Sequence, residues 1–330
     1  MSRKRILSGM RPSGKLHLGN YLGALANWVK LQDEYECFFM IADWHALTDR
    51  TDTTQIKQDV KEVLIDWLAV GLNPEKSVLF LQSHVHQHAQ LHLILSMITP
   101  LSWLERCPTY KEKIDAGVTT NYGLLGYPVL QAADILIYKA ERVPVGEDQL
   151  PHLELTREIA RKFNGLYGKV FPEPEPILSK SPRIMGLDGK KKMGKSYNNY
   201  IALSDPPDII KRKVMSMFTD PTKIYMGDPG HPEKCNVYSY HKIFGSDMGE
   251  DIEEIANECR EGKLGCTTCK ARIAEVLIKF LTPFREKRED IKKDKNFIKK
   301  VLDEGREKAS LAASLTLKEV KEAMKMDYYS

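Results

Sequence analysis

The chain has 330 residues, of which 42% are hydrophobic and 28% are charged, and its formal net charge at pH 7 is +4. This composition excludes an intrinsically disordered protein, and no apolar run is long enough to span a bilayer. Too few apolar residues follow the basic N-terminus to make a signal peptide, so we expect a cytoplasmic protein with reduced thiols and no membrane partner. At this length we expect one large and one smaller domain.

Short apolar runs alternate with amphipathic segments in the first half of the chain. Alternation of this kind indicates a parallel sheet with helices on both faces, which is a doubly wound, Rossmann-type α/β fold. The runs predict strands at 5–9, 37–43, 77–83 and 142–146, and helical spacing predicts helices at 17–31, 56–72, 86–98 and 148–164.

The second half has a different pattern. Residues 107–127 are rich in Gly and Thr and predict a mobile or inserted loop, and strand signals stop after the Pro- and Lys-rich segment 171–196. From about residue 204 the pattern is helical to the end. We therefore predict an α/β domain over 1–198 and an all-helical domain over 199–330.

The first motif with a chemical meaning is "PSGKLHLGNYLGAL" at residues 12–25. A predicted strand ends at Gly9, and His17, Gly19 and Asn20 would lie in the first turn of the following helix. The free N–H groups and the positive dipole end of such a helix favour a bound phosphate. His17 would donate to a phosphoryl group as its charge grows in the transition state; alternatively, it would only cap the helix.

The second motif is the loop "GKKKMGKS" at residues 189–196. Lys192 and Lys195 carry ammonium groups on long, flexible stems, which suits them to hold a leaving pyrophosphate. An exposed basic linker would have the same composition. The presence of the first motif favours the phosphate role.

The third motif is "YPVLQAADILIY" at residues 127–138. Tyr127, Gln131 and Asp134 are spaced to share one face of a helix. Because the rest of that helix is apolar, a buried Asp134 needs a partner. A ligand N–H or O–H would serve, and so would a backbone amide of the protein core.

The segment "VPVGEDQLPHLELTREI" follows at residues 143–159. Gly146, Glu147, Asp148 and Gln149 come directly after a predicted strand and lead into a helix. Doubly wound sheets bind their ligands at this position.

Together these motifs resemble the class I aminoacyl-tRNA synthetases. "PSGKLHLGN" is similar to their "HIGH" signature, and "KMGKS" (192–196) is similar to their "KMSKS" loop. Within that class, "SGMRPSGKLHLGNYLGAL", "ADWHALT" (42–48), "YPVLQAADILIY" and "VPVGEDQLPHLELTREIARKFN" resemble tryptophanyl-tRNA synthetases. The likeness extends from residue 5 to "VLDEGREKA" (301–309), and four motifs in the right order make it specific.

The resemblance implies an enzyme that activates L-tryptophan with Mg-ATP to tryptophanyl-adenylate and pyrophosphate, and then esterifies the tRNA for tryptophan. It also implies a homodimer, a catalytic domain at 1–198 and an anticodon-binding domain at 199–330. His17, Lys192 and Lys195 would be the catalytic residues. Residues implied at the ATP site are Arg11, Pro12, Ser13, Gly19, Asn20, Gly146, Glu147, Asp148, Ile184, Lys192, Met193, Gly194, Lys195 and Ser196. Asp134 would accept the indole N–H, and Tyr127, Gln131 and Gln149 would orient tryptophan.

The sequence departs from the family pattern in three places. Asn20 stands at the second His of "HIGH", which is usual in this branch, and Gly194 replaces the middle Ser of "KMSKS", so that a hydroxyl donor is missing. Gln131 stands where many bacterial tryptophan enzymes have Met, and Asp134 would accept a phenol O–H as well as an indole N–H. A tyrosyl-tRNA synthetase is therefore the first alternative, and a non-catalytic nucleic-acid-binding regulator with a metal site is the second.

Four of the six cysteines lie in the predicted helical domain. Cys235, Cys259, Cys266 and Cys269 are separated by 23, six and two residues. The other two, Cys37 and Cys107, lie in the α/β half, where we expect them to act as small buried hydrophobic residues. Four thiolates suit a structural zinc ion or an iron–sulfur cluster, and four unrelated thiols are the alternative.

The resemblance favours one of these metals. A subset of tryptophanyl-tRNA synthetases carries a 4Fe–4S cluster on a similar cysteine set. The resemblance therefore implies a 4Fe–4S cluster on these four cysteines, with Zn²⁺ as the alternative. Because tryptophan activation consumes no electrons, the implied role is structural.

Overall fold

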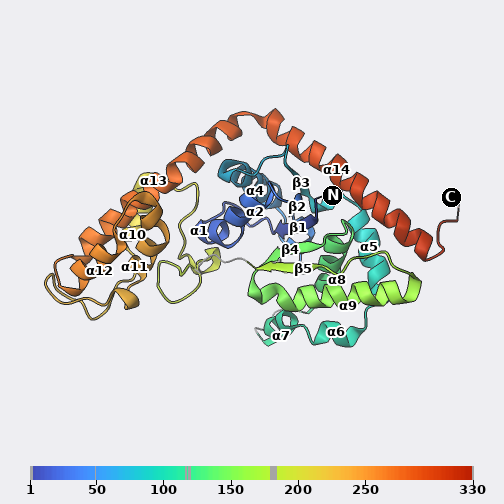
Figure 1. Ribbon diagram of the computed structural model, residues 1–330, viewed down its shortest axis with the longest axis horizontal. Coiled ribbons are helices and arrows are strands. Elements are labelled where there is room, and N and C mark those ends of the chain that lie inside the picture. Colours follow the sequence, from blue (N-terminus) through green and yellow to red (C-terminus); the bar gives the residue numbers. More distant parts are fainter. Residues whose placement is uncertain (1–2, 49, 116, 118–119, 179–183, 329–330) are drawn as a thin grey trace. The chain divides into compact units, whose positions relative to one another are not determined.

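The computed structural model of the chain describes residues 3–48, 50–115, 117, 120–178 and 184–328 (Figure 1). Contacts divide the chain into a sheet unit, residues 1–14, 27–179 and 294–330, and a helical unit, residues 15–26 and 180–293. The strands and helices are β1 (Arg5–Met10), α1 (Leu18–Asn20), α2 (Ala26–Leu31), β2 (Glu36–Ile41), α3 (Asp43–Ala46), α4 (Ile56–Val70), β3 (Ser77–Leu81), α5 (Gln87–Ser96), α6 (Leu101–Glu105), α7 (Pro108–Asp115), α8 (Tyr122–Leu136), β4 (Arg142–Val145), α9 (Leu150–Tyr167), β5 (Glu175–Leu178), α10 (Pro207–Met215), α11 (Asn236–Tyr240), α12 (Ile252–Arg260), α13 (Cys266–Lys293) and α14 (Lys295–Ala323).

The sheet is parallel and has the strand order β3-β2-β1-β4-β5. Ile6 of β1 is opposite Cys37 of β2 on one side and Arg142 of β4 on the other. The order therefore reverses next to β1, where doubly wound sheets bind ligands beyond the carboxyl ends of the strands. The predicted Rossmann-type fold is confirmed.

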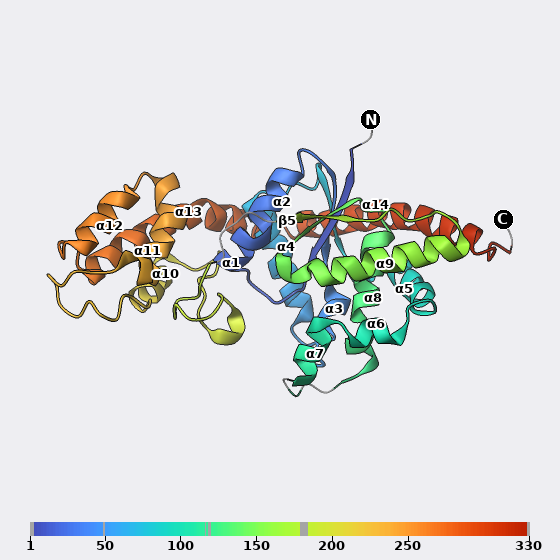
Figure 2. The ribbon, with the colours of Figure 1, turned by 60° about the horizontal axis from the view of Figure 1, so that its bottom comes forward.

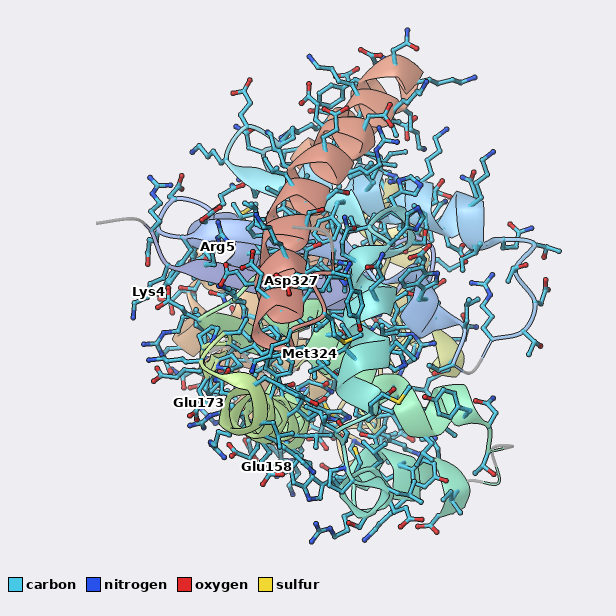
Figure 3. The ribbon with its side chains drawn as sticks, turned by 90° about the vertical axis from the view of Figure 1, so that its right-hand side faces the viewer. Lys4, Arg5, Glu158, Glu173, Met324 and Asp327 are labelled. Atoms are coloured by element: carbon cyan, nitrogen blue, oxygen red, sulfur yellow. The ribbon has the colours of Figure 1, made fainter. Side chains whose placement is uncertain are left out.

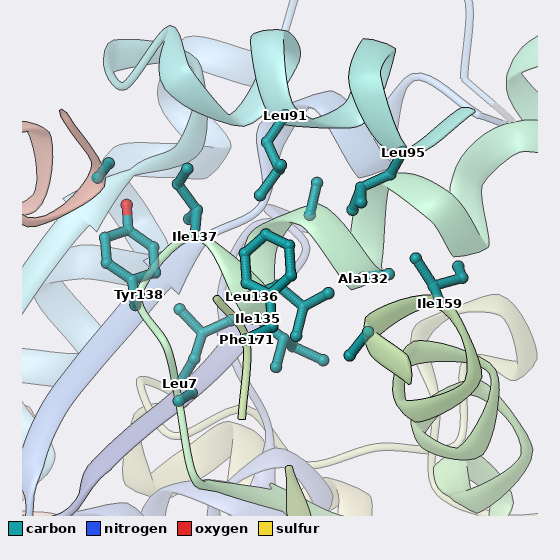
Figure 4. Close-up of a cluster of buried hydrophobic side chains, with 14 of the residues drawn as sticks. Leu7, Leu91, Leu95, Ala132, Ile135, Leu136, Ile137, Tyr138, Ile159 and Phe171 are labelled. Carbon is teal, nitrogen blue, oxygen red and sulfur yellow. The ribbon is translucent and has the colours of Figure 1, made fainter. Parts of the chain in front are cut away.

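Two adjacent phenylalanines on β2 show that helices cover both faces of the sheet. Successive side chains of a strand point to opposite faces. Phe39 stacks on Trp28 of α2 at a centroid distance of 4.7 Å, whereas Phe38 stacks on Tyr138, just after α8, at 4.6 Å. Figure 4 shows part of the apolar cluster on the Phe38 side, including Tyr138 and Phe171.

The last helix, α14, belongs to the sheet unit and packs against β3, the strand at the end of the sheet order. Lys139 Nζ pairs with Glu319 Oε2 at 2.5 Å, which ties α14 to the end of α8. Figure 3 shows the C-terminal end of α14, with Met324 and Asp327 labelled. A helix in this position covers backbone groups that an edge strand would otherwise expose.

The helical unit is built around α13, which packs against α10 and α11 (Figure 2). The chain from 15 to 26 joins this unit through main-chain hydrogen bonds: Leu18 donates to the Ile201 carbonyl at 3.0 Å, and Leu203 donates to the Leu16 carbonyl at 2.9 Å. The domain boundary predicted near residue 198 stays a prediction.

The structure corrects two local predictions. The prediction of a loop over 107–127 was wrong, because the described part of this segment contains α7 and the start of α8. The glycines and Pro128 within α8 obscured its helical period. Strand β5 was missed because it is short, half-exposed and contains Pro176, as edge strands can. Among the described residues, no helix is long and apolar enough to cross a membrane.

Candidate functional site

The first motif forms a helix start in which His17 is the cap. The Asn20 backbone N–H donates to His17 Nδ1 at 3.3 Å, and the His17 backbone N–H donates to Asn20 Oδ1 at 3.0 Å. Reciprocal bonds of this kind satisfy two N–H groups that a helix start leaves unpaired. His17 therefore caps the helix, which was one of the two roles considered for it.

The cap also determines which ring nitrogen of His17 carries the proton. Because Nδ1 accepts a hydrogen bond, the proton of the neutral ring lies on Nε2. Burial, followed by the positive charges of Lys195 and Lys192, lowers the pKa of His17 to about 4. The imidazole is therefore neutral at pH 7, with one N–H donor that the cap does not use.

The lysine loop is held by two side chains that the sequence analysis did not single out. Asp188 accepts the backbone N–H groups of Lys190 and Lys191 at 3.1 and 3.2 Å, and it accepts Asn199 Nδ2 at 3.0 Å. Asn199, which is 3% exposed, accepts the Gly194 N–H at 2.9 Å. Backbone turns built by short Asp and Asn side chains need no regular secondary structure.

The two signatures meet within the helical unit. A Cβ added to Gly19 would lie 3.0 Å from the His17 ring and 3.5 Å from Met193 Cβ. Met193 is buried, and its backbone N–H approaches the Ile184 carbonyl at 3.5 Å. Thus the structure brings His17 and the "KMGKS" loop together, as the phosphate role requires, and Ile184 is buried beside them.

Asp134 lies in the sheet unit and is 1% exposed. His45 Nε2 approaches its Oδ2 at 2.7 Å, His88 Nδ1 approaches its Oδ1 at 2.6 Å, and Gln82 Nε2 donates to both oxygens at 2.9 Å. Burial alone would raise the pKa of this carboxyl, but the hydrogen bonds from His45 and His88 outweigh burial and hold the pKa at about 2. Asp134 is therefore an ionised, acceptor-only group at neutral pH.

The other residues predicted to contact tryptophan lie on α8 and after β4. Tyr127 and Gln131 share α8 with Asp134, as predicted, and both are half-buried. The Tyr127 hydroxyl bonds to His152 Nε2 of α9, and burial raises the Tyr127 pKa. Gln149 donates to Asp148 Oδ2 at 2.9 Å.

Gly146 lies directly after β4, at the carboxyl edge of the sheet, and precedes Glu147 and Asp148. All three residues are exposed, and a Cβ on Gly146 would lie 2.7 Å from Asp148 Oδ1. Near the end of the neighbouring strand β1, the Ser8 hydroxyl donates to the Pro144 carbonyl at 3.2 Å. This carboxyl edge has the position expected for a nucleotide site.

The predicted site residues are thus divided between the two units. The helical unit contains His17, Gly19, Asn20, Ile184, Lys192, Met193, Gly194, Lys195, Ser196 and the four cysteines. The sheet unit contains Arg11, Pro12, Ser13, Tyr127, Gln131, Asp134, Gly146, Glu147, Asp148 and Gln149.

The four cysteines are free thiols that interact with one another. Cys269 experiences the charges of Cys235, Cys259 and Cys266, and burial followed by these charges raises its pKa to about 12. His241, which is fully buried, lies with Nε2 3.4 Å from Cys269 Sγ. Within the part of the chain that the structure describes, however, no group of three or more His, Cys, Asp or Glu side chains is arranged to hold a metal ion.

Sequence reasoning missed four polar residues that contact Asp134 or Tyr127: His45, Gln82, His88 and His152. His45 lies inside "ADWHALT", and "HVHQH" at 84–88 holds three histidines, but neither segment shows which ring faces Asp134. A cluster of side chains from separate elements has no local spacing that would reveal it.

The profile of the tRNA synthetases class I (W and Y) matches residues 2–282. The chain belongs to this family. It is 48% identical to the tryptophan–tRNA ligase of Thermotoga maritima, covering 98% of this chain and 99% of the relative, and 46% identical to that of Aquifex aeolicus, covering 98% and 100%. These relatives confirm the tryptophan branch predicted from the motifs, and with it a ligase.

Solved structures give the same result. The tryptophanyl-tRNA synthetase of Campylobacter jejuni, complexed with ADP and tryptophan, matches with a TM-score of 0.89 and 35% identity, over 97% of this chain and 99% of that chain. A tyrosyl-tRNA synthetase of Archaeoglobus fulgidus matches with a TM-score of 0.65 at 23% identity, which shows the fold alone.

Proposed function

We propose that the chain activates L-tryptophan with Mg-ATP and transfers it to the tRNA for tryptophan, as a homodimer in the cytoplasm. The observation that carries the choice of amino acid is the 46–48% identity to tryptophan–tRNA ligases over 98% of the chain. The geometry supports it, because a buried, ionised Asp134 is an acceptor suited to an indole N–H.

In the first step, the tryptophan carboxylate attacks the α-phosphorus of ATP, and pyrophosphate leaves. No protein side chain acts as the nucleophile, so the protein contributes positioning and electrostatic stabilisation. Nε2–H of His17 donates to a phosphate oxygen, and the neutral ring avoids a proton-transfer step. Lys192 and Lys195 follow the charge that develops on the pyrophosphate.

The remaining proposed residues bind and orient the two substrates. Tyr127, Gln131 and Gln149 would orient tryptophan around the acceptor Asp134. Arg11, Pro12, Ser13, Gly19, Asn20, Gly146, Glu147, Asp148, Ile184, Met193, Gly194 and Ser196 would complete the ATP site.

Amino-acid-dependent exchange of pyrophosphate into ATP tests this proposal. We expect exchange with tryptophan and at least about 10⁴-fold lower kcat/KM with tyrosine, because tyrosine does not supply the indole N–H for which we propose the site is built, and such a site strongly rejects an analogue without the matching hydrogen bond. Equal exchange with both amino acids, or exchange with tyrosine only, would contradict it.

We also propose Cys235, Cys259, Cys266 and Cys269 as ligands of a structural 4Fe–4S cluster, with Zn²⁺ as the alternative. The donor set fits, because four free thiols lie within electrostatic range of one another, and a bound metal would stabilise the thiolate forms that burial and the neighbouring cysteines disfavour. Since the described residues form no ready-made ligand set, the side chains would close around the metal as it binds.

Metal analysis of protein purified without oxygen separates the outcomes. Iron with broad absorption supports the cluster, one zinc per chain supports the alternative, and neither metal contradicts both. Cys266→Ser should abolish the bound metal, whereas Cys37→Ser, a buried cysteine of β2, should leave it unchanged.

A further inference from the structure

A chain of hydrogen bonds connects Asp134 to the interior of the sheet unit. The Tyr138 hydroxyl lies 2.7 Å from His88 Nε2, and His88 Nδ1 lies 2.6 Å from Asp134 Oδ1. Tyr138 and His88 are fully buried. His88 lies outside the motifs that identify the family, whereas Tyr138 is the last residue of "YPVLQAADILIY".

The Tyr138 ring is fixed by aromatic neighbours on two strands. It stacks on Phe38 of β2 at 4.6 Å, and it meets Phe80 of β3 edge-on at 5.4 Å. Figure 4 shows Tyr138 within the apolar cluster. Because the ring is held on two sides, its hydroxyl has a defined position from which to bond to His88.

These bonds also determine the proton on His88. Because the ionised Asp134 carboxylate can only accept, His88 Nδ1 carries a proton and donates it to Asp134, which leaves Nε2 to accept the hydrogen of the Tyr138 phenol. The opposite tautomer would place a lone pair of Nδ1 against a carboxylate oxygen. Tyr138 thereby keeps His88 in the tautomer that Asp134 needs.

The acceptor positions of Asp134 can be counted. A carboxylate offers about four lone-pair sites. His88 uses one on Oδ1, His45 uses one on Oδ2, and Gln82 bridges the two oxygens with a single donor. Because Gln82 lies 2.9 Å from both oxygens, it takes up a position on each, and an incoming N–H would have to share an oxygen with one of these three donors.

We propose that His88 and Tyr138 are positioning residues for amino-acid selection, which orient the Asp134 carboxylate towards the indole N–H. The inference rests on the proposed role of Asp134 in tryptophan binding. Neither residue touches substrate, and both act through Asp134. An apolar pair would fill the same volume without the cost of burying polar groups. We therefore infer that His88 and Tyr138 have a role beyond packing.

The test compares tryptophan with 3-benzothienylalanine, in which sulfur replaces the indole N–H, in pyrophosphate exchange by the full-length chain. His88→Leu removes the donor to Asp134, His88→Asn restores a donor near the Nδ1 position, and Tyr138→Phe removes only the hydroxyl. Tyr167→Phe, whose ring packs on Phe163 of the same cluster, is the matched control.

We expect His88→Leu to lower kcat/KM for tryptophan about 10-fold or more, and to lower it much less for the analogue, so that the preference for tryptophan narrows. Tyr138→Phe should narrow the preference for tryptophan roughly 3- to 10-fold. His88→Asn should recover part of the preference that His88→Leu loses. The KM for ATP should stay unchanged in all three variants. Tyr167→Phe should leave the preference at the wild-type value.

The inference is overturned if the folded His88→Leu and Tyr138→Phe variants keep the wild-type ratio of kcat/KM for tryptophan to kcat/KM for the analogue, whether or not both values fall. Asp134→Asn separates this failure from that of the proposed function. If Asp134→Asn collapses the preference while the His88 and Tyr138 variants do not, only the positioning role is wrong. If Asp134→Asn leaves the preference intact, the assigned role of Asp134 itself is wrong.

Discussion

His17 and Asn20 exchange two hydrogen bonds: the Asn20 N–H donates to His17 Nδ1, and the His17 N–H donates to Asn20 Oδ1. The pair explains why Asn at the second His position of "HIGH" is compatible with the family chemistry. The carboxamide completes the cap, and the cap leaves the proton of His17 on Nε2, where a phosphate can accept it.

The lowered pKa of His17 predicts a specific pH dependence of stability. Because the folded-state pKa is about 4 and the ordinary value is 6.5, the unfolded chain binds a proton between these values that the folded chain does not. Stability should therefore fall as the pH is lowered from 6.5 towards 4, with up to a tenfold change in the unfolding constant per pH unit from this residue.

Denaturant unfolding at pH 7, 6 and 5 measures the effect. His17→Asn keeps a capping side chain but does not titrate, so its stability should fall less than that of the wild type over this range. Parallel losses in the two proteins would show that folding does not lower the pKa of His17.

Lys195→Ala should reduce tryptophan-dependent pyrophosphate exchange by about 10²-fold or more, because one charge-stabilising group at a transferring phosphate contributes on this scale. Tryptophan binding, measured by calorimetry, should be largely retained. Lys190→Ala is the matched control, since this exposed lysine lies in the same loop and its backbone N–H, not its side chain, bonds to Asp188. Unchanged exchange in Lys195→Ala would rule out the role given to this lysine.

Gly194→Ser should be tolerated. Gly194 has φ −170° and ψ 150°, which is extended backbone that any residue adopts, and an added Cβ would meet its nearest neighbour, Tyr197, at 3.6 Å. The free energy of unfolding should change by less than about 0.5 kcal/mol, and exchange activity should equal or exceed the wild type.

Gly186→Ala, in the same region, is the contrasting variant. Its Cβ would overlap the Asn199 side chain, which holds the Gly194 N–H. Thermal unfolding should show a loss of about 1–3 kcal/mol. Equal stability of Gly186→Ala and Gly194→Ser would contradict the loop geometry described here.

Gly305→Ala should destabilise the protein strongly. A Cβ at Gly305 on α14 would overlap the backbone carbonyl of Leu79 on β3, and backbone cannot rotate away as a side chain can. We expect a loss of about 3 kcal/mol or more, seen as a lower thermal midpoint.

Gly165→Ala on α9 is the control for Gly305→Ala, because a Cβ there would meet no atom within 4 Å. Replacing glycine by alanine in an open helical position should stabilise the chain by about 0.5–1 kcal/mol. If both variants are equally stable, α14 does not lie against β3 in solution.

Local spacing in the sequence determined the parallel sheet, the helix start at His17 and the helix that places Tyr127, Gln131 and Asp134 on one face. These features depend on neighbours along the chain, and the periods of strand and helix make them visible. The motifs that identify the family also depend on neighbours along the chain, because each is a short continuous segment.

Only the tertiary structure showed what surrounds Asp134. Its partners His45, Gln82 and His88 are 89, 52 and 46 residues away in the sequence. It also showed that α14 packs on the sheet unit, through a close approach of Gly305 to β3. Such contacts depend on how whole elements pack, which leaves no periodic signal in the sequence. The sequence pattern therefore identified Asp134, and only the packing of distant elements showed which side chains bond to it.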